Sequence, residues 1–276
     1  MKGQGAERPS RMWAALLLVG LLAAGLPGHA QSVTFDEGWR AYERGDFSTA
    51  LKLWGELATT GDARAQFNIG VMYDEGRGVS ENMEIAIGWW KKAAENGHKQ
   101  AMHNLGLAYL FGRGTSIDYT KAVDYFRRAG DAGLAKSQYS LGKMYLSGFG
   151  VPQNVGEGFK WIEKAAASGV YQAQYNLGKM YRDGEGVARS EQAAAKWFLA
   201  AAEQGYARAQ NHIGVRLSRG EGIAKDEVEA LKWLILAATA GNDLAQQNRR
   251  ELAARLTPEQ RAQAEKRARE FQPKQM

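Results

Sequence analysis

The stretch 65–79, AQFNIGVMYDEGRGV, and the stretch 86–97, AIGWWKKAAENG, form a pattern that recurs every 36 residues. Matching segments begin at four later positions, Ala101, Ser137, Ala173 and Ala209. Four columns of glycine keep this step without an insertion, and they begin at Gly61, Gly70, Gly76 and Gly78. A fixed step over five units is the signature of a solenoid, in which each unit buries its apolar face by stacking on its neighbours.

Each unit is predicted to contain two short amphipathic helices. Apolar residues of the first stretch follow the spacing i, i+4, i+7, i+8, at Ala65, Ile69, Met72 and Tyr73. Those of the second stretch follow i, i+3, i+4, i+7, i+8 between Ala86 and Ala94. Glycine is expected to end both helices, the first at Gly76-Arg77-Gly78 and the second at Gly97, because it tolerates the positive φ of a helix terminus.

Gly70 lies in the middle of the first predicted helix, where glycine costs about 1 kcal/mol relative to alanine. The corresponding position holds glycine in all five units. A cost that recurs at one position indicates that two helices approach closely there. We expect the approaching side chain to be the large residue of the Trp89 column.

The pattern from Ala65 to Gly97, with its paired Trp89-Trp90 and Ala93-Ala94, resembles the Sel1-like repeat, a relative of the tetratricopeptide repeat. The resemblance implies an all-α fold: a right-handed α-solenoid of about six antiparallel helix pairs with a C-terminal capping helix. Exported proteins of this family act as adaptors or regulators in polysaccharide export, sensor control, control of cell-wall hydrolases or contact with a host. Nothing in the sequence selects among these roles.

Segments on both sides are expected to cap the repeats. We expect residues 31–62 to form a tetratricopeptide-like helix pair with a tight turn at Arg44-Gly45-Asp46. The five Sel1-like repeats are placed at residues 63–245, and capping helices at residues 246–276. The run Thr257-Pro258-Glu259-Gln260 is a capping box, which predicts a final helix from about Pro258 to Phe271.

Residues 1–30 have the arrangement of a cleavable secretory signal. Three basic residues precede an apolar run from Trp13 to Leu26, and small residues precede a cut after Ala30. The run is shorter than the roughly 20 residues that a membrane-spanning helix needs. We therefore expect export to the periplasm, with secretion as the alternative. A chain that kept this segment would be a membrane-tethered adaptor.

The sequence shows no catalytic, metal or cofactor motif. There is no cysteine, and His98 and His103 are five residues apart rather than the four of a helical zinc pair. The Gly-x-Gly turns lack the Gly-Lys-Ser/Thr continuation of a phosphate loop. We expect no catalytic residue, no metal and no cofactor, and we keep an enzyme of unrecognised type as an alternative.

The net charge of +6 does not indicate a nucleic-acid partner. Residues 31–248 carry 25 basic and 25 acidic residues, and residues 249–276 carry an excess of four positive charges. A solenoid without net charge lacks the electrostatic footprint that a phosphate backbone requires. The expected partner is another protein or peptide of the cell envelope, and the sequence leaves the oligomeric state open.

By the same resemblance, one face of the first helices lines a concave groove that binds this partner. The predicted groove residues are aromatic, basic or amide side chains: Phe67, His103, Lys136, Tyr139, Lys143, Gln172, Tyr175, Lys179 and Arg182. Tyrosines beside basic residues suit an extended acidic peptide, through stacking and charge. Two alternatives stay open: the aromatic residues cover neighbouring helices only, and the recurrent Asn68, Asn104 and Asn176 have a structural role.

Overall fold

The computed structural model describes residues 33–274, and the predicted signal peptide lies outside this part of the chain. Residues 33–274 form fourteen helices and no strand. The first helices of the pairs are α1 (Phe35–Glu43), α3 (Ala63–Glu75), α5 (Lys99–Phe111), α7 (Ala135–Ser147), α9 (Tyr171–Asp183), α11 (Ala207–Arg219) and α13 (Asp243–Ala253). The second helices are α2 (Phe47–Thr59), α4 (Met83–Glu95), α6 (Tyr119–Asp131), α8 (Val155–Ala167), α10 (Glu191–Glu203), α12 (Glu227–Thr239) and α14 (Pro258–Glu270).

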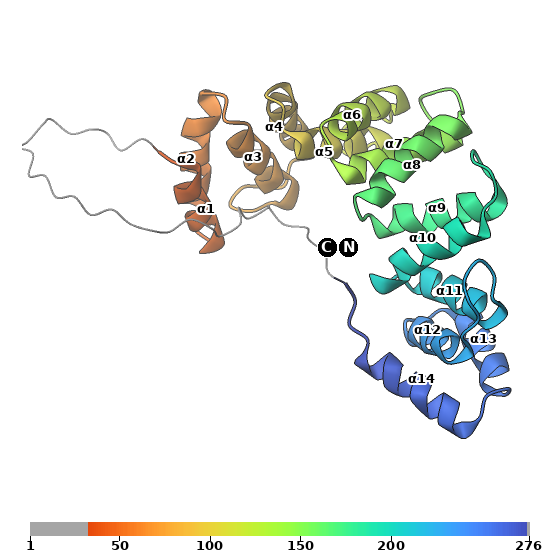
Figure 1. Ribbon diagram of the computed structural model, residues 1–276. Coiled ribbons are helices and arrows are strands. Elements are labelled where there is room, and N and C mark those ends of the chain that lie inside the picture. Colours follow the sequence, from red (N-terminus) through yellow and green to blue (C-terminus); the bar gives the residue numbers. More distant parts are fainter. Residues whose placement is uncertain (1–32, 275–276) are drawn as a thin grey trace, which may run out of the picture. The chain divides into compact units, whose positions relative to one another are not determined.

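Each helix from α1 to α12 packs against the next one along the chain, and α14 packs against α12 (Figure 1). The helices from α2 to α12 have thirteen residues each, so the constant step in sequence corresponds to a constant unit in space. The described chain is therefore an all-α solenoid, as the sequence predicts.

Glycine ends the helices where the sequence places it. Gly76 is the C-cap of α3 in the left-handed conformation, with φ 66°, and its N–H donates to the carbonyl of Met72. Gly97 follows the C-cap of α4, Asn96, with φ 84°. L-residues with a side chain rarely adopt such angles, so both glycine columns are fixed by backbone geometry.

The glycine in the middle of each first helix packs against a large side chain of the second helix. A Cβ atom at Gly70 would lie 2.5 Å from Cδ1 of Trp90, and one at Gly106 would lie 2.6 Å from Cδ1 of Phe126. The same contact joins three further pairs, Gly142–Ile162, Gly178–Phe198 and Gly214–Leu234. Any residue larger than glycine would force the two helices apart or displace the side chain.

The expectation that Trp89 makes this contact was wrong by one position. Adjacent residues on a helix are about 100° apart around its axis, so Trp89 and Trp90 lie on different faces of α4. Trp90 is buried against Gly70, whereas Trp89 packs on the core cluster that contains Trp54 and Ile69. The Trp90 column thus makes the contact within a helix pair. The Trp89 column packs on the core cluster that the pair forms with the preceding one.

The second glycine of each turn contacts the preceding unit. A Cβ atom at Gly114 would lie 2.5 Å from Cγ of Met83, and one at Gly186 would lie 2.9 Å from Cγ1 of Val155. Both glycines have positive φ, 64° and 75°. Both the available space and the backbone angle therefore require glycine here. The close contact of this glycine with the preceding unit holds successive units at one spacing.

A glutamine in each of four first helices binds the end of the preceding second helix. Nε2 of Gln66 donates to the carbonyl of Ala58 at 3.0 Å. Three other glutamines donate in the same way to the carbonyl eight residues earlier: Gln138, Gln174 and Gln210. Met102 replaces the glutamine in the second repeat, and there Arg128 donates to the carbonyl of Ala94 instead, at 3.3 Å.

The carbonyl oxygen of this glutamine receives a hydrogen bond in only some units. Nδ2 of Asn96 donates to Oε1 of Gln66 at 2.9 Å, and Nε2 of Gln204 donates to Oε1 of Gln174 at 2.8 Å. The corresponding residue of the third repeat is Ser168, whose side chain is shorter. Oε1 of Gln138 is buried and has no hydrogen-bond partner among the described residues.

The N-terminal pair keeps the glycine contact with a shorter connection. α1 and α2 are joined by Arg44-Gly45-Asp46, and Gly45 has φ 80°. Gly38 faces the ring of Trp54 as Gly70 faces Trp90. The outer side of Trp54 is covered by three more rings, those of Phe35, Trp39 and Tyr42.

At the C-terminal end one residue changes the packing. α13 begins at Asp243 in phase with the repeats, so the boundary expected at residue 245 falls inside this helix. Arg250 stands where the other first helices have their central glycine, which excludes close approach of a second helix, and α14 packs on α12 instead. The predicted capping box of α14 is confirmed, with Thr257 N–H donating to Gln260 Oε1 at 2.9 Å.

The unsatisfied Oε1 of Gln138 makes the replacement Ser168→Gln informative. The introduced amide would donate to this oxygen as Gln204 donates to Gln174, and we expect the free energy of unfolding to rise by about 1 kcal/mol. Ala132→Gln is the matched control, because its counterpart on α5 is Met102, which offers no amide oxygen. Chemical denaturation measures both variants. Equal effects of the two changes would contradict this assignment.

Candidate protein-binding surface

The predicted aromatic column connects each first helix to the next one. The hydroxyl of Tyr139 accepts a hydrogen bond from Nδ2 of Asn176 at 2.9 Å. The hydroxyl of Tyr175 lies 3.4 Å from Nε2 of His212. Both partners belong to the following first helix, so these tyrosines contribute to the stacking of units as well as to the surface. The amide of Asn176 has a structural role in the same bond.

Earlier members of the column also contact the next unit. The ring of Phe67 stacks on His98 with centroids 4.4 Å apart, and Nδ1 of His103 lies 2.8 Å from Oγ of Ser137. His98 is the N-cap of α5, where its Nδ1 accepts from the N–H of Ala101. On α3 and α5 the column therefore consists of a phenyl ring and imidazoles, whose positions are fixed by stacking and by hydrogen bonds within the chain.

Burial sets the charge of these rings. It lowers the pKa of His98, His103 and His212 to about 4, because the imidazolium form loses hydration inside the solenoid. It raises the pKa of Tyr139 and Tyr175 for the corresponding reason. All five rings are neutral at pH 7, so the positive charge of this face comes from its lysines.

Lysines accompany the tyrosines on α7 and α9. Nζ of Lys143 lies 5.9 Å from the centroid of the Tyr139 ring, a weak cation–π contact. Within residues 33–274, no carboxylate lies within 4.0 Å of the ammonium group of Lys143 or Lys179. These cations are therefore available to a negatively charged partner.

Arg182 differs from these lysines. Its guanidinium donates two hydrogen bonds of 2.7 Å to the carboxylate of Asp183, which lowers the pKa of that carboxyl. The pair adds no net charge to the surface. Arg182 thus lies on the predicted helix, but its charge is compensated within the chain.

Six of the nine predicted residues occupy equivalent positions on two neighbouring first helices. We call this set the α7–α9 stripe, and it consists of Lys136, Tyr139 and Lys143 on α7 and of Gln172, Tyr175 and Lys179 on α9. Phe67 and His103 belong to α3 and α5, where Val71 and Leu107 stand in place of Lys143. The structure therefore divides the predicted set into a basic, tyrosine-rich part and an apolar part.

Two further tyrosines, Tyr171 and Tyr206, adjoin the stripe and are not among the predicted groove residues. The ring centroid of Tyr206 lies 5.2 Å from those of Tyr171 and Tyr175. Tyr206 stands at the N-cap position of α11, which has no side-chain cap, whereas Asp62 caps α3 at the same position. The replacement of a capping residue such as Asp62 by Tyr206 at the N-cap position is the sequence signal for this additional ring.

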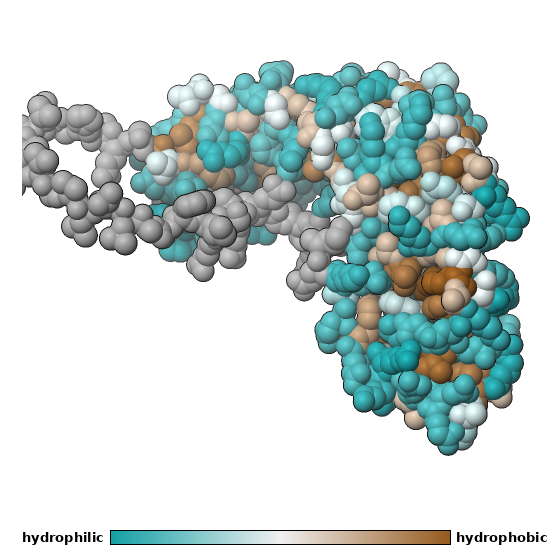
Figure 2. All heavy atoms as spheres, in the orientation of Figure 1, coloured by the Kyte–Doolittle hydropathy of each residue, from teal (hydrophilic) through white to brown (hydrophobic). Residues whose placement is uncertain are grey.

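Most of the face drawn in Figure 2 is hydrophilic, so exposed apolar side chains are informative. Phe111 and Ile117, at and after the end of α5, are 64% and 57% exposed. Phe149, after α7, is also exposed and stacks on Tyr119 with centroids 5.2 Å apart. The first repeat has charged residues at the corresponding loop positions, Glu75, Glu81 and Arg77. The difference is at helix ends and in loops, where helical periodicity gives no signal.

The described part of the chain contains no cluster of three or more histidine and carboxylate side chains that could hold a metal ion. Among residues 33–274, no helix combines the length and apolar composition that crossing a membrane requires.

Comparison with known proteins identifies the repeats. The Sel1 repeat model matches residues 63–98, 99–134, 135–170, 172–206 and 207–242. The chain belongs to the Sel1 repeat family. Repeats of this family generally serve as scaffolds that bind other proteins and are typically non-catalytic. No curated protein matches the sequence.

Solved structures share the fold of this Sel1 repeat protein. A Sel1 repeat protein from Oxalobacter formigenes is 30% identical, with a TM-score of 0.74, over 86% of this chain and 99% of that chain. The protective antigen c5321 of uropathogenic Escherichia coli, which has an SLR fold, is 27% identical, with a TM-score of 0.57. That similarity covers 86% of this chain and 59% of c5321.

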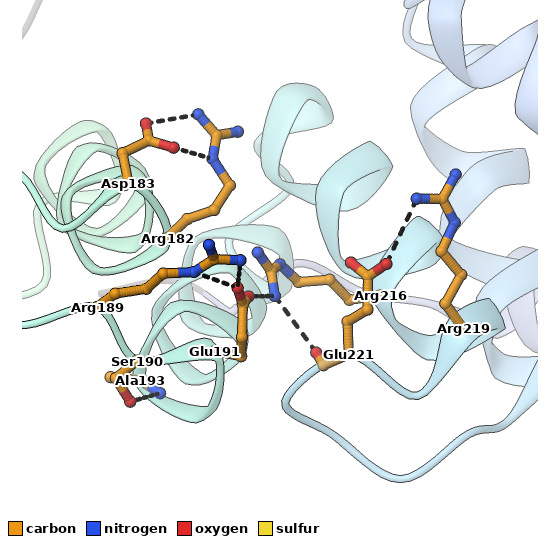
Figure 3. Close-up of polar contacts among 9 residues, drawn as sticks. All are labelled: Arg182, Asp183, Arg189, Ser190, Glu191, Ala193, Arg216, Arg219 and Glu221. Atoms are coloured by element: carbon orange, nitrogen blue, oxygen red, sulfur yellow. Dashed lines mark hydrogen bonds and ion pairs between the residues drawn. The ribbon is translucent and has the colours of Figure 1, made fainter.

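In the fifth Sel1 repeat an ion pair replaces an apolar contact. Arg216 is only 4% exposed and occupies the position of Met144 and Met180 in earlier repeats. Its Nη1 lies 2.6 Å from Oε2 of Glu191, which stands where the preceding repeat has Val155. The other carboxylate oxygen of Glu191 accepts from Arg189, and both arginines lower its pKa (Figure 3).

The polar cluster in Figure 3 is internally satisfied. Each of its carboxylates has an arginine partner, in the pairs Asp183–Arg182, Glu191–Arg216 and Glu221–Arg219. The cluster therefore connects neighbouring Sel1 repeats and offers no free carboxylate for catalysis or for a metal.

The ion pair between Arg216 and Glu191 predicts that substitutions of the two residues have non-additive effects on stability. Glu191→Val alone leaves a buried guanidinium without its carboxylate, and we expect a loss of about 3 kcal/mol or more in the free energy of unfolding. Adding Arg216→Met restores the apolar contact of the earlier repeats, and we expect stability near that of the unmodified chain. Denaturant unfolding of both variants measures the difference. A double variant as unstable as the single one would refute the compensation.

Proposed function

We propose that this Sel1 repeat protein is a scaffold of the cell envelope that holds an extended, acidic segment of another protein on the α7–α9 stripe. The observation that carries the proposal is the pair of lysines, Lys143 and Lys179, that lie beside half-buried tyrosines without a carboxylate within ion-pair distance in the described chain. On other first helices, Arg64 of α3 and Arg216 of α11 each pair with a carboxylate, at 3.1 and 2.6 Å.

The stripe combines two features that bind peptides. Tyrosine rings offer large, rigid contact area at a low cost in side-chain entropy, and Tyr139 and Tyr175 are already fixed by their hydrogen bonds. Lysines at the same register on α7 and α9 match an acidic partner and raise its rate of association. Because equivalent positions are one repeat apart, the partner segment is extended along the stack rather than confined to one unit.

The envelope location is part of the same proposal. It rests on the basic start, the short apolar run from Trp13 to Leu26 and the small residues before Gln31. The described chain contains no cysteine that an oxidising compartment would oxidise, which agrees with the periplasm. The activity we propose is binding, and no step of it requires a cofactor.

Charge reversal on the stripe tests the proposal. We expect Lys143→Glu with Lys179→Glu to reduce capture of the partner in envelope crosslinking by at least about tenfold, because two attractive contacts become repulsive. The matched control is Lys52→Glu with Lys91→Glu, which changes the net charge equally at exposed positions of α2 and α4.

The crosslinking has two readouts. Equal loss of capture in the stripe and control variants would show that net charge alone binds the partner, and unchanged capture in both would place the binding surface elsewhere. Mass spectrometry of the same sample reports the N-terminus: a chain that begins at Gln31 agrees with export and cleavage, and an intact Met1 would make the protein a tethered adaptor.

A further inference from the structure

The segment that follows α14 lies along the second helices. The helix ends at Glu270, and Phe271 continues in an extended conformation, with φ −67° and ψ 128°. From there the chain runs past α12 to the end of α10 (Figure 1). We call residues 271–274 the C-terminal strap.

The strap is held by contacts of the kind that bind a peptide. The backbone N–H of Lys274 donates to the carbonyl of Glu203 at 2.8 Å, and its Nζ donates to Oε2 of the same residue at 2.7 Å. The ring of Phe271 packs edge-on against Trp233, with centroids 5.2 Å apart. Pro273 lies over Gly205, where a Cβ atom would be 3.5 Å from its ring.

Between the strap and the helices lies a cavity of about 390 Å³, and Phe271, Gln272 and Lys274 of the strap form one side of it. Its wall is mostly apolar and comes from α10, α11, α12 and the loop before α12, with side chains of Leu199, Leu217, Ile223 and Trp233. Hydrophobic residues also gather over the region of α11 and α12 in Figure 2. The space is large enough for one large side chain of a ligand, and its wall favours an apolar or aromatic one.

Two polar features of the cavity remain unused or exchangeable. Trp233 is in the cavity wall and 2% exposed, and its buried indole N–H, like that of Trp90 elsewhere in the solenoid, has no acceptor among the described residues. A buried N–H without an acceptor is rare, because it costs the hydration that it loses. At the other end Glu203 is bound only through the exposed Lys274, whereas Glu229 is already bound by Lys232 and Arg267.

The strap itself is weakly attached. Its last three residues are exposed, and an ion pair between exposed side chains is screened by water and contributes little to stability. Residues 271–274 contact only two helix ends in the described chain, the C-cap of α14 at Phe271 and the last carbonyl of α10, that of Glu203. Detachment of such a segment would leave the helices of the solenoid folded.

We propose that this cavity is part of a peptide-binding site that the C-terminal strap covers in cis, and that the site takes from a partner protein an extended segment with an aromatic residue three positions before a lysine or arginine. The aromatic side chain enters the apolar cavity, a backbone carbonyl of the partner accepts from Trp233, and the basic residue replaces Lys274 at Glu203. The site is formed by α10, α11, α12 and the loop before α12, so it shares no residue with the α7–α9 stripe and does not depend on the function proposed for it.

The strap then acts as an internal competitor. A partner binds only the fraction of molecules in which the strap is detached, so the apparent affinity falls by that fraction. Release of the strap, by substitution or by a competing contact elsewhere, raises the affinity without any change in the site itself.

The test uses the amidated peptide Ala-Arg-Glu-Phe-Gln-Pro-Lys, which copies residues 268–274, and the full chain with Phe271→Ala and Lys274→Glu. We expect the peptide to bind this strap-released chain saturably and at least tenfold more tightly than it binds the unmodified chain. Tryptophan fluorescence or NMR measures both affinities. Glu203→Gln in the released chain is expected to weaken the binding again. A peptide in which Ala and Glu replace Phe and Lys is expected not to bind.

Two controls keep the result decisive. Arg269→Ala changes an exposed residue of α14. A chain with this substitution is expected to bind the peptide with the same affinity as the unmodified chain. If Phe271→Ala disturbs α14, Lys274→Glu alone releases the exposed end of the strap and leaves the core intact. Equal affinity for released and unmodified chains, or no saturable binding to either released chain, would overturn the proposal.

Discussion

The contact between the central glycine of a first helix and a large side chain of the second helix sets the geometry of the six pairs from α1/α2 to α11/α12. It recurs from Gly38 with Trp54 to Gly214 with Leu234, while the partner side chain varies among tryptophan, phenylalanine, isoleucine and leucine. The constant feature of the contact is therefore the absence of a Cβ atom at the glycine. The facing side chain varies and fills the space that the absent Cβ atom leaves. This contact accounts for a glycine that helix propensity alone would reject.

Contacts between units depend on that geometry. Once the two helices of a pair are fixed, the turn glycine reaches the preceding second helix and the glutamine reaches the preceding carbonyl. These contacts use turns and buried positions, which leaves the outward side of the first helices free to differ between repeats. Lysines and tyrosines accumulate there on α7 and α9 but not on α3, so one regular scaffold carries a local binding surface.

Periodicity predicts most of this fold, because helix ends and central glycines are local features that repeat. The Trp89 and Trp90 columns are harder to distinguish, since both are large, apolar and adjacent, and only the relative rotation of two helices decides which one meets Gly70. Partners in different repeats are harder still. The bond from Asn176 to Tyr139 and the pairing of Arg216 with Glu191 depend on the register between units. The candidate surface is predictable as a set of columns, whereas its division into a basic part and an apolar part requires the structure.

The central claim is that a Cβ atom at the inner glycine position separates the paired helices, and two alanine substitutions test it directly. Gly88 lies on the exposed side of α4 with open space around it, and Gly88→Ala should raise the free energy of unfolding by up to about 1 kcal/mol. A Cβ atom at Gly106 would lie 2.6 Å from Cδ1 of Phe126, and Gly106→Ala should lower the free energy of unfolding by about 1–2 kcal/mol. If Gly106→Ala stabilised the chain as Gly88→Ala does, the glycine contact would not be what sets the packing.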